Sequence, residues 1–247
     1  MTARTAVVTG IVGGIGAAIA ARLAANGARV AVTDLPGPAG EEAAARLGLP
    51  FIPADLGNGA QVHELIARVA RDHGAPQILV TAAGGVRGQV SRPVEEVPEA
   101  DWRALFAVNV DAAFFLAQAV APAMKAAGWG RIVTISSGAG LRPSLTGIQA
   151  YAAAKHALVG LTKQLSLELG PHGITVNSVA PGFVLSNPAT QAQWEAYGPE
   201  GQAALVRRIH TRRLGTPEDI AAAAVFLTGQ EAGWISGQIL SVDGGVA

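Results

Sequence analysis

The chain contains no cysteine, which excludes disulfides and thiolate metal sites. It also carries little charge: Asp, Glu, Lys and Arg make up 15% of its 247 residues, and 18 basic residues balance 18 acidic ones. Because the sequence has no net charge and no basic stripe, nucleic acid is not an expected partner. The five histidines show no paired ligand spacing, so no metal site is expected.

Long uninterrupted hydrophobic runs are also missing. Residues 5–25 are apolar enough to resemble a targeting segment, but glycines break the run and Arg22 interrupts the region where cleavage would fall. The same stretch is too short for a membrane span of about 20 residues, and no later stretch approaches one. We therefore expect a cytoplasmic protein with no membrane contact.

The abundant residues indicate the class of fold. Half of the chain is hydrophobic, and glycine alone contributes 31 residues, a balance typical of closely packed α/β proteins and not of disordered chains. No linker, repeat or low-complexity tract divides the sequence. The length is sufficient for one large core, so a single domain over residues 1–247 is expected.

Short β-branched runs alternate with longer helical patterns. Strands are expected over 5–9, 28–34, 50–55, 77–82, 130–137, 173–182 and 237–245. Helices are expected over 14–26, 39–47, 58–73, 99–127, 150–169 and 217–228, with a polar, irregular stretch over 186–212. Apolar strands separated by helices predict a parallel sheet covered on both faces. Right-handed crossovers make it a doubly wound sheet of the Rossmann type.

A glycine-rich segment, "TGIVGGIG" at 9–16, joins the first expected strand to the first helix. A loop in that place can bring a pyrophosphate to the free N–H groups of the helix N-terminus. Asp34 follows the second strand, 18 residues after Gly16, where an acid can accept hydrogen bonds from the adenosine ribose. Its carboxylate would repel a 2′-phosphate, so NAD is predicted rather than NADP. The alternative role for Asp34 is to cap the next helix.

A tyrosine and a lysine lie four residues apart in the expected helix 150–169. Tyr151 and Lys155 therefore project from one helix face. Tyrosine is a poor base at its reference pKa of about 10, and a cation about 4 Å away could lower that pKa by about three units. This pair suits the exchange of a hydroxyl proton, although a Tyr–Lys pair can also lie on a solvated face.

Two further polar positions accompany this pair. Ser136 and Ser137 end the preceding strand, at the edge where a parallel sheet presents its ligands. Ser137 would hold a substrate oxygen beside Tyr151, with Ser136 as the second candidate. Asn109 lies on the apolar stripe of the helix 99–127, where its amide needs partners. It could stabilise a kink, hold a water, or do both.

These motifs, in this order, resemble the short-chain dehydrogenase/reductase family. The other matching stretches are "ADL" (54–56), "NVDAAF" (109–114), "ITVNSVAPGFV" (174–184), "RLGTPEDIA" (213–221) and "ISGQILSVDGG" (235–245). The resemblance implies a catalytic tetrad of Asn109, Ser137, Tyr151 and Lys155. It implies cofactor contacts from Gly10, Gly14, Ile15, Gly16, Asp34, Asp55, Leu56, Ala83, Gly84, Tyr151, Lys155, Pro181, Gly182 and Val184. It also implies a homotetramer that pairs long helices and the last strand.

Two stretches depart from the family pattern. The family usually has N-N-A-G after the fourth strand, whereas this chain reads "TAAG" at 81–84, and Thr81 could replace the missing amides in part. The separation of Ser137 from Tyr151 is one residue longer than the family's, and the intervening segment contains Arg142. The second departure leaves open whether Ser136 or Ser137 orients the substrate.

The residues and the resemblance together predict an oxidoreductase. A hydride would pass between NAD(H) and a secondary alcohol or ketone, with Tyr151 as the general acid/base. The segment 183–212 should form a lid over the substrate. Its aromatic and basic residues, with Arg87 and Arg142 nearby, favour a polar, hydroxylated or anionic substrate such as a sugar or polyol, unless the arginines only cover the surface. The alternatives are an NADP-dependent carbonyl reductase and a non-catalytic NAD-binding regulator on the same fold.

Overall fold

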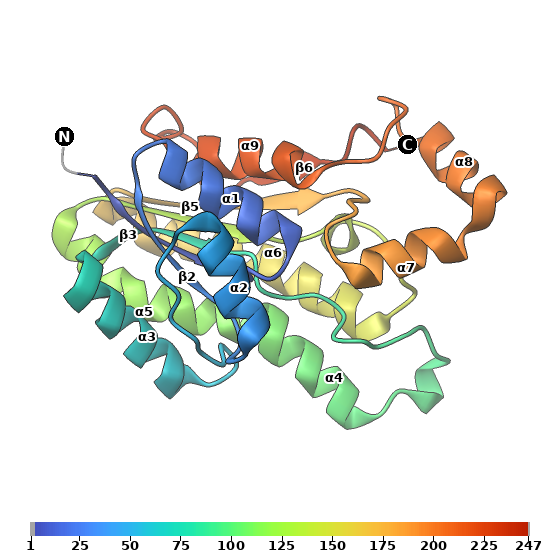
Figure 1. The fold of residues 1–247 in the computed structure, drawn as a ribbon, viewed down its shortest axis with the longest axis horizontal. Helices are drawn as coiled ribbons and strands as arrows, with labels where there is room; N and C mark the ends of the chain where they lie inside the picture. The colour runs from blue at the N-terminus through green and yellow to red at the C-terminus, as the bar shows by residue number, and fades with distance from the viewer. Residues whose placement is uncertain (1–2, 247) are drawn as a thin grey trace.

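A computed structural model describes residues 3–246 of the chain. Within these residues, six strands form one sheet in the order β2-β1-β3-β4-β5-β6 (Figure 1). The strands are β1 (Thr5–Thr9), β2 (Arg29–Thr33), β3 (Pro76–Thr81), β4 (Gly130–Ile135), β5 (Ile174–Pro181) and β6 (Ile239–Val242). Every neighbouring pair is parallel. The predicted doubly wound parallel sheet is confirmed.

Helices cover both faces of this sheet. One face carries α1 (Gly14–Ala25), α2 (Pro38–Leu47) and α9 (Pro217–Leu227), and the other carries α3 (Gly59–His73), α5 (Ala112–Ala127) and α6 (Gln149–Leu169). Strand residues alternate between the two cores: Val8 packs into the first and Val7 into the second. Helices α1 and α9 lie side by side, on the opposite side of the sheet from α3 and α5 (Figure 1).

The helical segment Glu99–Ala127 is divided by a local change in winding. Helix α4 (Glu99–Phe106) passes through a π-helical turn (Ala107–Asp111) into α5. By length and composition alone this segment is apolar enough to cross a membrane, so the prediction that no later stretch approaches a span is wrong. Three of its large side chains, Leu116, Val120 and Met124, are fully buried in the core shared with the sheet.

Two expected elements differ from the structure. Residues 50–55 form no strand; only a single bridge joins Phe51 to Val32. Pro50 and Pro53 lack the N–H donors that a continued ladder needs.

The stretch 186–212 was expected to be irregular, but it contains α7 (Pro188–Ala196) and α8 (Gly198–Arg208). A capping box starts α7, since the Asn187 side chain accepts from the Thr190 amide at 3.0 Å. Figure 1 shows both helices projecting at one end of the sheet.

Candidate active site

The residues singled out in the sequence gather at the carboxyl ends of the parallel strands. The glycine loop follows β1 and Asp34 follows β2. Ala83 and Gly84 follow β3, Ser137 follows β4, and Pro181 ends β5 just before Gly182 and Val184. Ligands of doubly wound sheets bind at this edge, so the fold brings the predicted site residues to the expected place.

The glycine loop needs its glycines because backbones approach one another closely. Gly10 has a φ of +74°, and a Cβ there would lie 2.6 Å from the amide nitrogen of Ala83. A Cβ on Gly16 would run into the carbonyl oxygen of Gly10. The loop is thereby held tightly between the ends of β1 and β3 and the first turn of α1.

The N-terminus of α1 presents free backbone donors. Its N-cap residue, Gly13, has no side chain to cap the helix, and the first turn contains no acidic residue. Within the described part of the chain, the amides of Ile15 and Gly16 make no hydrogen bond, while the Gly14 amide donates to the carbonyl of Ser186 at 2.8 Å. Unpaired N–H groups at the positive end of a helix fit the pyrophosphate of a dinucleotide.

The side chain of Asp34 turns toward the glycine loop. Its Oδ2 accepts from the amide of Val12 at 3.0 Å, and its Oδ1 accepts from the amide of Leu35 at 2.9 Å. The next helix, α2, has Gly37 as its N-cap and no side-chain cap, so the alternative that Asp34 caps this helix is wrong. The carboxylate instead lies beside the loop that would hold the pyrophosphate.

The "ADL" stretch runs alongside this carboxylate. The amide of Ala54 donates to the carbonyl of Asp34 at 3.0 Å. Asp55 is exposed and its Oδ1 accepts from the Gly57 amide at 3.0 Å, while Leu56 is buried. Asp55 and Leu56 thus lie next to the place expected for the adenosine part of a dinucleotide.

The hydroxyl of Ser137, and not that of Ser136, lies against Tyr151. Ser137 lies close enough to Tyr151 to lower the pKa of its phenol, and the Ser137 Oγ accepts from the amide of Ala139 at 3.1 Å. Ser136 is buried, and its Oγ lies 3.5 Å from the carbonyl oxygen of Lys155. Consecutive strand residues point to opposite faces, so only one of the two serines can reach the tyrosine.

The pKa values of the Tyr–Lys pair are governed mainly by burial. Burial raises the pKa of Tyr151, and the neighbouring Ser137 side chain opposes this rise. Burial lowers the pKa of Lys155 to about 8. The Lys155 Nζ donates to the carbonyl of Ile135 at 3.0 Å and lies 5.7 Å from the centroid of the Tyr151 ring.

Lys155 was expected to lower the pKa of Tyr151 from about 4 Å away. Among the protein groups, burial is the largest influence and raises the pKa of Tyr151. A lowering of this pKa by Lys155 together with the positively charged nicotinamide ring stays a prediction.

Asn109 lies in the π-helical turn and is 2% exposed. Its Nδ2 donates to the carbonyls of Leu105 at 2.9 Å and Gly85 at 3.0 Å, and its Oδ1 accepts from the Gly85 amide at 2.9 Å. The amide therefore ties the turn to the loop after β3. Gly84 has a φ of +148°, and a Cβ there would lie 2.7 Å from the Asn109 Oδ1 and 3.4 Å from the Lys155 Nζ.

Thr9, which the sequence analysis overlooked, holds the segment 81–84, which departs from the family pattern. The Oγ1 of Thr9 accepts from the Ala83 amide at 2.9 Å. The buried Oγ1 of Thr81 has no hydrogen-bond partner among the described residues, so the expectation that Thr81 replaces the missing amides is wrong. The available sequence signal for a role of Thr9 was its position as the first residue of the glycine-rich segment 9–16.

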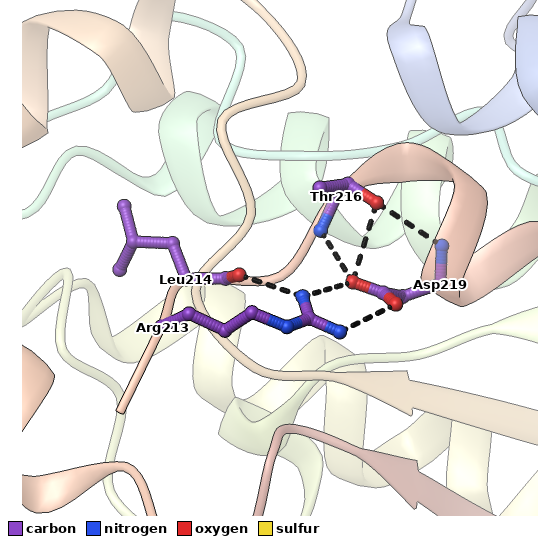
Figure 2. Close-up of polar contacts among 4 residues, drawn as sticks. All are labelled: Arg213, Leu214, Thr216 and Asp219. Atoms are coloured by element: carbon purple, nitrogen blue, oxygen red, sulfur yellow. Dashed lines mark hydrogen bonds and ion pairs between the residues drawn. The ribbon is translucent and has the colours of Figure 1, made fainter. Parts of the chain in front are cut away.

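A compact polar cluster stabilises the start of α9 (Figure 2). Arg213 donates to both carboxylate oxygens of Asp219, at 2.6 and 2.8 Å. Thr216 and Asp219 form a reciprocal capping box at the N-terminus of α9. A Cβ on Gly14 would lie 3.2 Å from the Cγ of Pro217, so this cluster sets α9 against the glycine loop.

The fold and the site define a dinucleotide-binding α/β oxidoreductase, and comparison with known proteins specifies the family. Residues 10–247 match a family model described as enoyl-(acyl carrier protein) reductase. The D-threitol dehydrogenase of Mycolicibacterium smegmatis is 39% identical over 98% of this chain and 92% of its own length. The chain belongs to the short-chain dehydrogenase/reductase family, whose members use a nicotinamide cofactor.

Two further matches differ in substrate. The D-β-hydroxybutyrate dehydrogenase of Rhizobium meliloti is 35% identical over 98% of both chains. A solved structure of an actinorhodin polyketide ketoreductase with NADPH superposes with a TM-score of 0.91, at 30% identity, covering 98% of this chain and 97% of that one. The confirmed family thus accounts for the fold and the class of reaction, and leaves cofactor and substrate to be argued from the site.

Proposed function

We propose that the protein is an NAD-dependent dehydrogenase that oxidises a secondary alcohol of a polyol or related hydroxylated compound. The observation that carries this proposal is that Ser137, Tyr151 and the buried Lys155 come together at the carboxyl edge of the sheet, where Ser137 lowers the pKa of Tyr151 and the Lys155 Nζ lies 5.7 Å from the centroid of the Tyr151 ring. This arrangement supports Tyr151 as the proton-transferring hydroxyl and Ser137 as the hydroxyl that orients the substrate. The family's nicotinamide cofactor, when bound, accepts a hydride from the carbinol carbon.

Each polar group of the site has a role in this reaction. Ser137 donates to or accepts from the reacting oxygen, and Tyr151 takes the hydroxyl proton as general base. Because burial raises the pKa of Tyr151, its deprotonated form depends on added positive charge from Lys155 and the cofactor. Asn109 holds the loop after β3 and Gly84 in place, which supports the position of the Lys155 ammonium.

The cofactor preference is proposed from Asp34. Its carboxylate lies beside the glycine loop and is held by two backbone amides. A 2′-phosphate at that place would meet a fixed negative charge, which favours NAD. The structural relative solved with NADPH shows that related chains can bind the phosphorylated cofactor, so the affinities of both cofactors must be compared directly.

Replacement of the proposed base tests the reaction. Tyr151→Phe should abolish oxidation of D-threitol and of simpler secondary alcohols, yet bind NADH with a Kd close to that of the wild type. Activity retained by the variant would contradict the mechanism. A wild-type protein that binds NADH but turns over no carbonyl or alcohol in a broad panel would support the alternative of a non-catalytic regulator.

The homotetramer implied by the family resemblance is also a proposal. Exposed apolar side chains on the helices and on the last strand support the homotetramer. They are Phe114 of α5, Phe226 of α9 and Leu240 of the edge strand β6. Contiguous apolar patches on a surface mark interaction sites, and homo-oligomers pair equivalent surfaces by symmetry. Analytical ultracentrifugation should show four copies, and Phe114→Glu should reduce that number. The cytoplasmic location stays a prediction.

A further inference from the structure

An ion pair joins two segments that are far apart in the sequence. The Nη2 of Arg142, in the loop between β4 and α6, lies 3.2 Å from the Oδ2 of Asp243, which follows β6. The Asp243 side chain is only 13% exposed, while that of Arg142 is 42% exposed. Arg142 belongs to the segment that is one residue longer than the family pattern.

This pair lies next to the proposed catalytic groups. A Cβ on Gly138, the residue after Ser137, would lie 3.4 Å from the Nη2 of Arg142. On the other side, a Cβ on Gly182 would lie 2.8 Å from the Cα of Asp243. The pair thus lies beside the residues that follow Ser137 and the end of β5, near the place where the substrate oxygen is to be held.

The carboxylate of this pair is fixed by the backbone around it. The Oδ1 of Asp243 accepts from the Gly245 amide at 3.0 Å. The carbonyls of Gly245 and Gly244 accept from the amides of His210 at 2.7 Å and Thr211 at 3.1 Å. The Asp243 side chain therefore cannot turn away from a ligand without breaking its bonds to Gly245 and Arg142, and the backbone that carries it is held by the segment 210–211.

The guanidinium of this pair keeps unused donors. Within the described residues, the Nε and Nη1 of Arg142 make no hydrogen bond, and its backbone amide donates to the Gly138 carbonyl at 3.1 Å. A neutral hydroxyl can both accept from Arg142 and donate to Asp243. A substrate carboxylate would instead meet an arginine that is already neutralised and a fixed negative charge beside it.

We propose that the Arg142–Asp243 pair selects neutral polyhydroxy substrates and rejects hydroxycarboxylates. This inference rests on the proposed function, since it concerns the substrate of the same site. It separates the two kinds of compound named by the relatives, a sugar alcohol and a hydroxy acid. Asp243 is the residue of the pair that distinguishes the two kinds of substrate, because its carboxylate accepts hydrogen bonds from hydroxyls and repels carboxylates.

The test compares kcat/KM for D-threitol and D-β-hydroxybutyrate as probes. The wild type should prefer D-threitol, and Asp243→Asn should raise the ratio of hydroxybutyrate to threitol at least about tenfold. The asparagine keeps an oxygen for the Gly245 amide, so the loop should persist. Asp72→Asn, which removes the same charge from an exposed ion pair at the end of α3, should leave the ratio unchanged.

A second variant separates substrate contact from support of the loop. Arg142→Met should raise KM for D-threitol about tenfold while leaving isopropanol, which has one hydroxyl, within about twofold. Equal losses for both alcohols would mean that Arg142 only supports the segment after Ser137, and would overturn the inference. The cofactor Kd and the melting temperature are measured for each variant, and they identify any variant that fails to fold.

The outcomes distinguish this inference from the proposed function. If the wild type oxidises secondary alcohols but Asp243→Asn leaves the ratio unchanged, only the inference fails. A wild-type preference for D-β-hydroxybutyrate also overturns the inference and leaves the dehydrogenase activity intact. If no alcohol is oxidised by the wild type, both proposals fail.

Discussion

The amide of Gly14 donates a hydrogen bond of 2.8 Å to the carbonyl oxygen of Ser186. Gly14 is the first residue of α1, in the loop that is expected to hold the pyrophosphate, and Ser186 lies just before α7. This bond joins the glycine loop directly to the base of the segment 183–212. Cofactor binding and the position of that segment are therefore expected to depend on each other.

A methyl group on Gly14 should disturb this junction. Its Cβ would lie 3.0 Å from the Ser186 oxygen and 3.2 Å from the Cγ of Pro217, both closer than ordinary contacts. Gly14→Ala should therefore raise the Kd of NADH by about tenfold, measured by fluorescence titration. Gly13→Ala is the matched control, since its Cβ would approach only the Gly10 oxygen, at 3.4 Å. An equal effect of both changes would contradict this account.

The charge of Asp34 should decide between the two nicotinamide cofactors. Asp34→Asn keeps an oxygen that can accept from the Val12 amide but removes the negative charge. The ratio of the Kd of NADP to that of NAD should fall by about tenfold, as measured by calorimetry. Asp55→Asn, a neutralisation at the neighbouring exposed carboxylate, should change both Kd values alike. Tighter binding of NADP by the wild type would refute the argument.

The sheet and most helices could be predicted from the sequence because their signals are local. Apolar β-branched runs such as 77–82 and glycine stops such as Gly128 mark strands and helix ends without tertiary information. Helices α7 and α8 were missed because neither contains a buried residue, so no apolar face packed on the core marks either of them in the sequence. The capping box at Asn187 was the available signal.

The site was predictable where one element carries both partners. Tyr151 and Lys155 share α6, so their spacing alone placed them together. The choice between Ser136 and Ser137 depended on the direction in which each side chain leaves the end of β4, which no spacing rule shows. The contact of Arg142 with Asp243 is a tertiary contact between segments on either side of α6 and β5, and sequence reasoning had no means to find it.

The pH dependence of oxidation should reveal the effect of Ser137 on Tyr151. Tyr151 must be deprotonated to accept the substrate proton, so kcat/KM should rise with pH. The Ser137 side chain lowers the pKa of Tyr151, and removal of its hydroxyl in Ser137→Ala should move this rise to higher pH. Turnover should also fall by about a hundredfold, because the substrate oxygen loses its orienting partner.

Ser136→Ala is the control for this pH profile. Its hydroxyl lies 3.5 Å from a backbone oxygen and does not contact the tyrosine, so the profile should keep its position. The pH profiles of both variants are measured with the same alcohol at saturating cofactor. A shift in Ser136→Ala and none in Ser137→Ala would reverse the assignment.

The capping box of α9 should contribute measurably to stability (Figure 2). The Thr216 Oγ1 accepts from the Asp219 amide at 3.3 Å, and Asp219 accepts in return from the Thr216 amide at 2.9 Å. Thr216→Ala should lower the free energy of unfolding by about 1 kcal/mol in urea titrations. Thr216→Ser keeps the hydroxyl and should stay within about 0.5 kcal/mol of the wild type. Equal losses in both variants would show that the threonine methyl group, and not the cap, stabilises the helix.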